Sequence, residues 1–175
     1  MTTIAEKDRP TIRDLLAREL VGEVELLLFT RRSSPQFTSG QQDGQSSAET
    51  RELLDELVGL SDKLSLTVHD LDADPAAATQ LNVALAPTVI IRQRKYSTDR
   101  PGDRSSQTTV TPAEKADRAH NGVRFVGLPG GYEFSTMLAD IVDVSKGQTS
   151  LSEATRAAVR ALDSPVHIQV FVTPT

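Results

Sequence analysis

Short apolar runs with two different periodicities alternate along this chain and predict strands and helices in turn. Val24–Thr30 is almost entirely apolar, as in a buried central strand, and Leu64–Asp70 alternates apolar with polar residues, as in a strand with one exposed face. Aliphatic residues at helical spacing predict helices over Thr11–Val21, Ala48–Leu60 and Tyr132–Val144. This alternation of strands and helices indicates an α/β fold.

The remaining predicted elements are shorter. Asp74–Leu81 is expected to be a helix, with Asp as its N-cap and Pro at its first position. Val89–Ile91 and Val123–Val126 have the apolar character of two hairpin strands. A helix over Ser150–Leu162 and a strand over Val166–Val172 are predicted to follow.

Two polar stretches interrupt this pattern, and we expect both to be loops. Residues 31–47 are dominated by Ser, Gln and Gly, and residues 92–121 form the most polar part of the chain. Because the second stretch separates the two hairpin strands, it is predicted to be a long insertion inside the hairpin.

The last predicted helix and strand repeat the first pair. Val24–Thr30 (VELLLFT) and Val166–Val172 (VHIQVFV) share an initial Val, an aliphatic residue at the third place and an aliphatic-Phe pair. We therefore expect two structural units, residues 1–146 and residues 147–175, the second of which is cut off just after its first strand.

A proline before the third predicted strand introduces a family resemblance. Pro87, within Leu85-Ala86-Pro87-Thr88, resembles the cis-proline that faces a Cys-x-x-Cys motif across a groove in thioredoxin-like proteins. More specifically, the chain resembles the N-terminal half of the two-domain protein disulfide oxidoreductases, which are glutaredoxin-like with tandem thioredoxin folds. The resemblance implies a central mixed sheet flanked by helices, plus the first helix and strand of a second thioredoxin-like unit. It rests on residues 24–29, 60–65, 86–87, 122–129, 132–134, 140–145 and 166–175.

The place of the family's Cys-x-x-Cys is occupied by Pro35, Gln36, Phe37 and Thr38, and the chain contains no cysteine. The resemblance therefore implies a degenerate, redox-inactive first half, with the exchange cysteines in a second thioredoxin-like domain beyond residue 175. Simple loss of the motif is one interpretation, and an exposed Phe37 retained for partner contact is the other. The N-terminal domain of the flavin-containing alkyl hydroperoxide reductase subunit is also similar, which adds a flavin reductase as a candidate partner.

Ala86, Pro87 and Thr88 are the candidate groove residues under this resemblance. An extended peptide or protein substrate that carries a disulfide or thiol would pair with the backbone of Ala86 as an added strand. The alternative is that the cis-proline only shapes the fold.

Composition narrows the remaining options. The formal net charge of -5, from 24 acidic and 19 basic residues, argues against a nucleic-acid partner, because such a partner requires a basic face. No apolar run approaches the ~20 residues of a membrane span, and Met1–Pro10 lacks the apolar core of a signal peptide. We therefore expect a cytoplasmic protein without a membrane partner.

No metal site or cofactor is expected from the residues. His69, His120 and His167 are scattered, and Asp70, Asp72 and Asp74 lack the Gly and Glu that a calcium loop would need. Those aspartates fit a solvated turn and helix cap better.

Three hypotheses for function follow. The first is a redox-inactive thioredoxin-like domain of a thiol–disulfide oxidoreductase with a role in cell redox homeostasis, the chemistry being done by cysteines beyond residue 175 through a mixed disulfide. The second is a complete, cysteine-free binding or scaffold module, against which an exposed apolar strand at 166–172 argues. The third is an electron-relay domain of a flavin-dependent peroxide-reducing system. In each case the chain alone is expected to be inactive in thiol–disulfide exchange.

Overall fold

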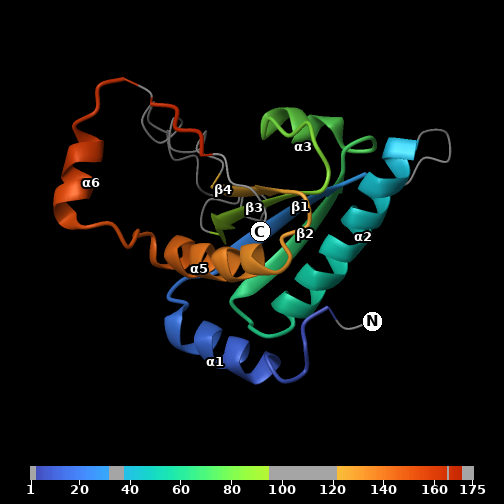
Figure 1. The fold of residues 1–175 in the computed structure, drawn as a ribbon, viewed down its shortest axis with the longest axis horizontal. Coiled ribbons are helices and arrows are strands. Elements are labelled where there is room, and N and C mark those ends of the chain that lie inside the picture. Colours follow the sequence, from blue (N-terminus) through green and yellow to red (C-terminus); the bar gives the residue numbers. More distant parts are fainter. Residues whose placement is uncertain (1–2, 32–37, 95–121, 165, 171–175) are drawn as a thin grey trace, which may run out of the picture.

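A four-stranded mixed sheet lies at the centre of the molecule (Figure 1). The computed structural model describes residues 3–31, 38–94, 122–164 and 166–170. The strands are β1 (Val24–Thr30), β2 (Leu64–Asp70), β3 (Thr88–Gln93) and β4 (Val123–Val126), in the spatial order β2-β1-β3-β4. β1 is parallel to β2, whereas β3 is antiparallel to both β1 and β4.

Helices cover the two faces of the sheet unequally. Three helices pack on one face around the larger apolar cluster: α1 (Arg9–Glu19), α2 (Thr38–Val58) and α5 (Tyr132–Lys146). The short helix α3 (Pro75–Gln80) packs on the other face around a smaller cluster. Figure 1 shows α6 (Glu153–Arg160) standing away from the sheet, and none of its residues is buried. None of the helices among the described residues is long and apolar enough to cross a membrane.

The central position of β1 explains its nearly continuous apolar run. Successive side chains of a strand point to opposite faces, so Leu26 and Leu28 join the larger cluster while Leu27 and Phe29 join the smaller one. Six of the seven residues of β1 are buried. The bounds predicted for β1, β2 and β4 from the sequence are confirmed, as is the mixed sheet.

The prediction of a loop over residues 31–47 is wrong from Thr38 onward, because α2 begins there, ten residues before the predicted start. Between residues 44 and 50, the buried positions of α2 are Gly44, Ser47 and Thr50, which lie three residues apart. The Thr50 hydroxyl donates to the carbonyl of Ser46, and the Ser47 hydroxyl accepts from the backbone N–H of Arg31. Small polar side chains therefore provide the close contact that aliphatic residues usually provide.

The predicted role of Asp74 as a side-chain cap is also wrong. Asp74 stands at the N-cap of α3, yet its carboxylate makes no cap hydrogen bond and instead lies 3.0 Å from Nδ1 of His69. Asp70 organises the turn before the helix, since its Oδ1 accepts from the backbone N–H groups of Asp72 and Ala73. The interaction of the Asp74 carboxylate with the imidazole of His69 on β2 therefore takes the place of a side-chain cap on α3.

The predicted hairpin insertion starts later than residue 92. Arg92 and Gln93 belong to β3, where Arg92 pairs with Glu25 across the strands and Gln93 donates to the carbonyl of Val144 at 2.7 Å. Cross-strand and helix partners for polar side chains extend the strand beyond its apolar run. Residues 95–121 of the predicted insertion lie outside the described residues.

The predicted last helix forms, but the predicted last strand does not. α6 is capped by Ser152, whose hydroxyl accepts from the backbone N–H of Thr155. Residues 166–170 have no regular secondary structure, and they are exposed; residues 171 and 172 lie outside the described residues. A strand needs a neighbour for its backbone groups, and within the described part of the chain the sheet pairings involve only β1 to β4.

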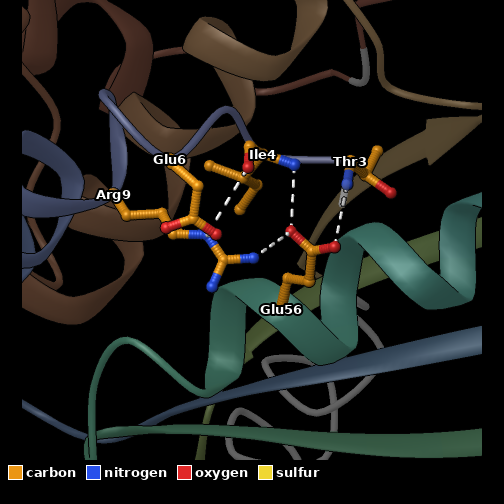
Figure 2. A network of polar contacts seen from close by, with 5 residues as sticks. All are labelled: Thr3, Ile4, Glu6, Arg9 and Glu56. Atoms are coloured by element: carbon orange, nitrogen blue, oxygen red, sulfur yellow. Dashed lines mark hydrogen bonds and ion pairs between the residues drawn. The ribbon is translucent and has the colours of Figure 1, made fainter. Parts of the chain in front are cut away.

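A carboxylate on α2 holds the segment that precedes α1 (Figure 2). The two oxygens of Glu56 accept from the backbone N–H of Thr3 at 2.8 Å and of Ile4 at 2.9 Å, and Nη2 of Arg9 lies 2.9 Å away. Ile4 is thereby buried in the larger cluster. These contacts lower the pKa of Glu56, with the hydrogen bond from Ile4 as the largest cause.

We expect Glu56→Gln to release the N-terminal segment. Because folding lowers the pKa of Glu56 from its unfolded value of 4.5, the ionised carboxylate stabilises the fold at pH values above 4.5. This contribution is lost as the pH falls through the pKa of the folded state. In the variant, the amide protons of Thr3 and Ile4 should exchange with solvent about tenfold faster than in the wild type at pH 7. Hydrogen exchange followed by NMR measures this effect. Glu52→Gln, at an exposed position of the same helix, should leave both rates unchanged; equal acceleration in the two variants would contradict the anchoring role.

Candidate functional site

The loop before β3 lies where the ends of three strands meet. The Ala86–Pro87 peptide bond is cis, as the resemblance implied, and Thr88 begins β3 directly after it. Thr88 is the register partner of Phe29 near the end of β1 and of Val126 at the end of β4. The cis-proline therefore lies at the end of the sheet at which β1 finishes.

Hydrogen bonds fix this loop from both sides. The Thr88 hydroxyl donates to the carbonyl of Leu85 at 2.7 Å, and the backbone N–H of Gly127 donates to the carbonyl of Pro87 at 2.8 Å. Pro87 is buried, and Thr88 is only 2% exposed. Two of the three candidate groove residues thus lie inside the structure and position the loop.

The accessible part of the loop is apolar. Ala86 is half-buried, and among the hydrogen bonds of the described residues none involves its backbone N–H or carbonyl. Leu85, two residues before the proline, and Val126, the register partner of Thr88, are each 61% exposed. Sequence reasoning did not predict the exposure of Leu85, since an isolated Leu in a loop before a strand carries no periodic signal.

The degenerate motif is only partly visible. Pro35, Gln36 and Phe37 lie outside the described residues, whereas Thr38 is the first residue of α2. The four positions therefore connect β1 to the start of the next helix. The roles assigned to them from the sequence remain predictions.

A titratable pair lies on β2 and at the start of α3. His69 stacks on Phe29 with ring centroids 5.0 Å apart, and its Nδ1 faces the carboxylate of Asp74. Within the ranges that the structure describes, no three His, Cys, Asp or Glu side chains are placed to hold a metal ion.

The topology and the cis-proline define a thioredoxin-like α/β domain, and solved structures agree. The fold matches a mutant of the alkyl hydroperoxide reductase AhpF of Enterococcus faecalis with a TM-score of 0.62, 19% identity, and coverage of 91% of this chain and 61% of that chain. It matches a protein disulfide oxidoreductase of Aeropyrum pernix with a TM-score of 0.62, 21% identity, and coverage of 90% and 55%.

Curated sequences point to the same relatives. The chain is 22% identical over 161 residues to the F subunit of alkyl hydroperoxide reductase from Staphylococcus epidermidis, and the match covers 92% of this chain and 25% of that protein. The same protein of Staphylococcus aureus gives the same identity and coverage. No known family profile matches the chain. The chain spans about a quarter of the length of the curated relatives it matches.

Proposed function

We propose that this chain is a redox-inactive thioredoxin-like unit of a larger thiol–disulfide oxidoreductase, whose exchange cysteines lie in a second thioredoxin-like unit beyond residue 175. The observation that carries the proposal is the combination of a cis-proline at the thioredoxin position with a chain that contains no cysteine. The chain matches only about a quarter of the length of the reductase subunits, which supports a protein longer than this chain. Residues 147–175 would then begin the second unit.

The proposed task of this unit is to bind an extended segment of a disulfide- or thiol-bearing protein. Among the hydrogen bonds of the described residues none uses the backbone of Ala86, and the neighbouring Leu85 and the nearby β4 residue Val126 are exposed. An extended peptide can pair with such a backbone and place alternate side chains against the apolar neighbours. Ala86 and the adjacent cis-proline would thereby hold a substrate close to the cysteines of the second unit.

The experiment that tests the larger protein is a measurement on cell extract. An antibody against this chain should detect a protein well above 19.0 kDa, and that protein, once purified, should reduce insulin disulfides while the 175-residue chain does not. A tightly bound flavin in the purified protein would favour the third hypothesis, an electron relay to a peroxide-reducing partner, which the resemblance to the reductase subunits supports. Detection of the 19.0 kDa species alone would instead favour a binding or scaffold module.

We expect Leu85→Asp to weaken peptide binding by the chain. Full-length S-carbamidomethylated insulin B chain serves as the extended probe, and fluorescence anisotropy gives its dissociation constant. Loss of one apolar contact should raise that constant about fivefold or more. Val21→Asp is the matched control, because Val21 is 73% exposed in the connection before β1. An equal effect of both variants, or none of Leu85→Asp, would contradict the assignment of the groove.

A further inference from the structure

The chain leaves α3 through a tight turn at Asn82, whose φ of 51° lies in the left-handed region. The backbone N–H of Asn82 donates to the carbonyl of Thr79 at 3.1 Å. That of Val83 donates to the carbonyl of Ala78 at 2.8 Å. The two bonds form a Schellman motif, which ends a helix and accepts Gly or, less often, Asn at its left-handed position. The turn directs residues 83–86 away from the helix and toward the cis-proline.

One side chain of β4 fastens this turn to the sheet. Arg124 is the register partner of Ile90 on β3, and its guanidinium extends to two successive carbonyls of the turn. Its Nη1 donates to the carbonyl of Asn82 at 2.9 Å, and its Nη2 donates to the carbonyl of Leu81. The last carbonyls of a helix have no partner within the helix, and the planar fork of an arginine can bind two acceptors at once. Arg124 therefore ties the end of α3 to β4.

The other end of the same segment is attached just beyond β4. Gly127 directly follows β4, and its backbone N–H donates to the carbonyl of Pro87 at 2.8 Å. The Thr88 hydroxyl holds the carbonyl of Leu85, close to this second attachment. Residues 83–86 thus run between two points that are fixed to β4 or its end, and Arg124 supplies the one on the helix side.

We propose that Arg124 is a positioning residue for peptide binding, which holds residues 83–86 so that the backbone of Ala86 can pair with an extended peptide. The inference rests on the proposed function of this loop. A binding loop that is fixed before it meets its ligand loses less conformational entropy on binding, so its affinity is higher. Without the guanidinium, the turn at Asn82 would lose its attachment to the sheet, and Leu85 and Ala86 would sample more conformations. Arg124 acts through the loop and needs no contact with the peptide.

Arg124→Leu tests this role, because leucine keeps the apolar stem but donates no hydrogen bond. Backbone amide relaxation of the peptide-free chain should show the order parameters of Leu85 and Ala86 falling below about 0.6. The dissociation constant of S-carbamidomethylated insulin B chain, measured by fluorescence anisotropy, should rise about tenfold. Arg124→Lys should raise it only about two- to threefold, since an ammonium group lacks the fork that serves both carbonyls.

Two controls separate positioning from general stability. Arg94→Leu removes an exposed guanidinium beyond the far end of β3 and should change neither quantity. Ser145→Ala removes a hydroxyl that joins α5 to the connection before β1, so it should lower stability without loosening the loop. Backbone amide spectra verify that each variant is folded. If Arg124→Leu does not fold, Arg124→Lys provides the same two measurements.

The outcomes distinguish the role of Arg124 from the proposed function. Unchanged order parameters in both Arg124 variants overturn the positioning role, as does a looser loop that binds the peptide with unchanged affinity. In those cases the wild type still binds, and the groove itself stands. If the wild type does not bind the insulin B chain, the groove is wrong and the positioning role falls with it.

Discussion

Ser145→Ala is expected to lower the free energy of unfolding by about 3 kcal/mol. The hydroxyl of Ser145, near the end of α5, accepts from the backbone N–H groups of Val21 and Gly22, both at 2.9 Å, and donates to the carbonyl of Gly22 at 2.8 Å. Ser145 is only 3% exposed. Alanine would leave two donors and one acceptor without the hydroxyl at a part-buried place, and each such group costs roughly 1–3 kcal/mol where water does not replace the hydroxyl.

Urea unfolding measures this loss, and the same helix supplies the control. Ser135 is exposed, and its hydroxyl donates to the carbonyl of Tyr132 within its own helix. Ser135→Ala should change stability by less than about 0.5 kcal/mol. A cost below about 1 kcal/mol for Ser145→Ala would mean that water replaces the hydroxyl in the variant. The large expected effect reflects the position of Ser145, which joins α5 to the connection between α1 and β1.

The strands could be predicted from the sequence because the buried face of a strand carries mainly apolar side chains. A strand buried on both faces is therefore mostly apolar, and a strand buried on one face alternates apolar with polar residues. β1 is apolar at five of its seven positions, and the apolar Leu64, Leu66 and Val68 of β2 all face the larger cluster. The early turns of α2 show no such pattern of apolar residues. From residue 44 to residue 50 the buried positions are Gly44, Ser47 and Thr50, and these residue types are more common in loops than in helix interiors. Tertiary packing overrides their low helix propensity.

The last segment shows the opposite error. Residues 166–170 alternate apolar with polar residues, as a strand does. This pattern indicates that the segment can form a strand, but it does not indicate whether a neighbouring strand is present to pair with it. The candidate site, too, could be predicted only in part. The cis-proline was implied by the family resemblance, whereas the exposure of Leu85 and the burial of Thr88 depend on how the loop folds back on itself. That folding rests on the bond from the Thr88 hydroxyl to the Leu85 carbonyl and the bond from the Gly127 N–H to the Pro87 carbonyl, neither of which leaves a signature in the sequence.

Glu25→Ala is expected to destabilise the sheet by about 3 kcal/mol. The carboxylate of Glu25 on β1 accepts from the hydroxyl of Thr67 on β2 at 3.1 Å and from Nε of Arg92 on β3 at 2.9 Å. The Glu25 side chain is 11% exposed and that of Arg92 26%, so the pair ties three strands together largely out of water. Removal of the carboxylate would leave a mostly buried guanidinium without its counter-charge, and that loss outweighs the loss of volume.

A double variant distinguishes the uncompensated charge from the intrinsic value of the pair. Glu25→Met combined with Arg92→Leu should lie within about 1 kcal/mol of the wild type, since apolar side chains of similar size often replace a buried ion pair at little cost. Glu23→Ala is the exposed control, because Glu23 and Arg94 are 60% and 54% exposed and 3.5 Å apart; it should cost less than about 0.5 kcal/mol. If the double variant were as unstable as Glu25→Ala, the sheet would depend on the ion pair itself. A near-wild-type double variant would instead show that Glu25 is needed because Arg92 is present.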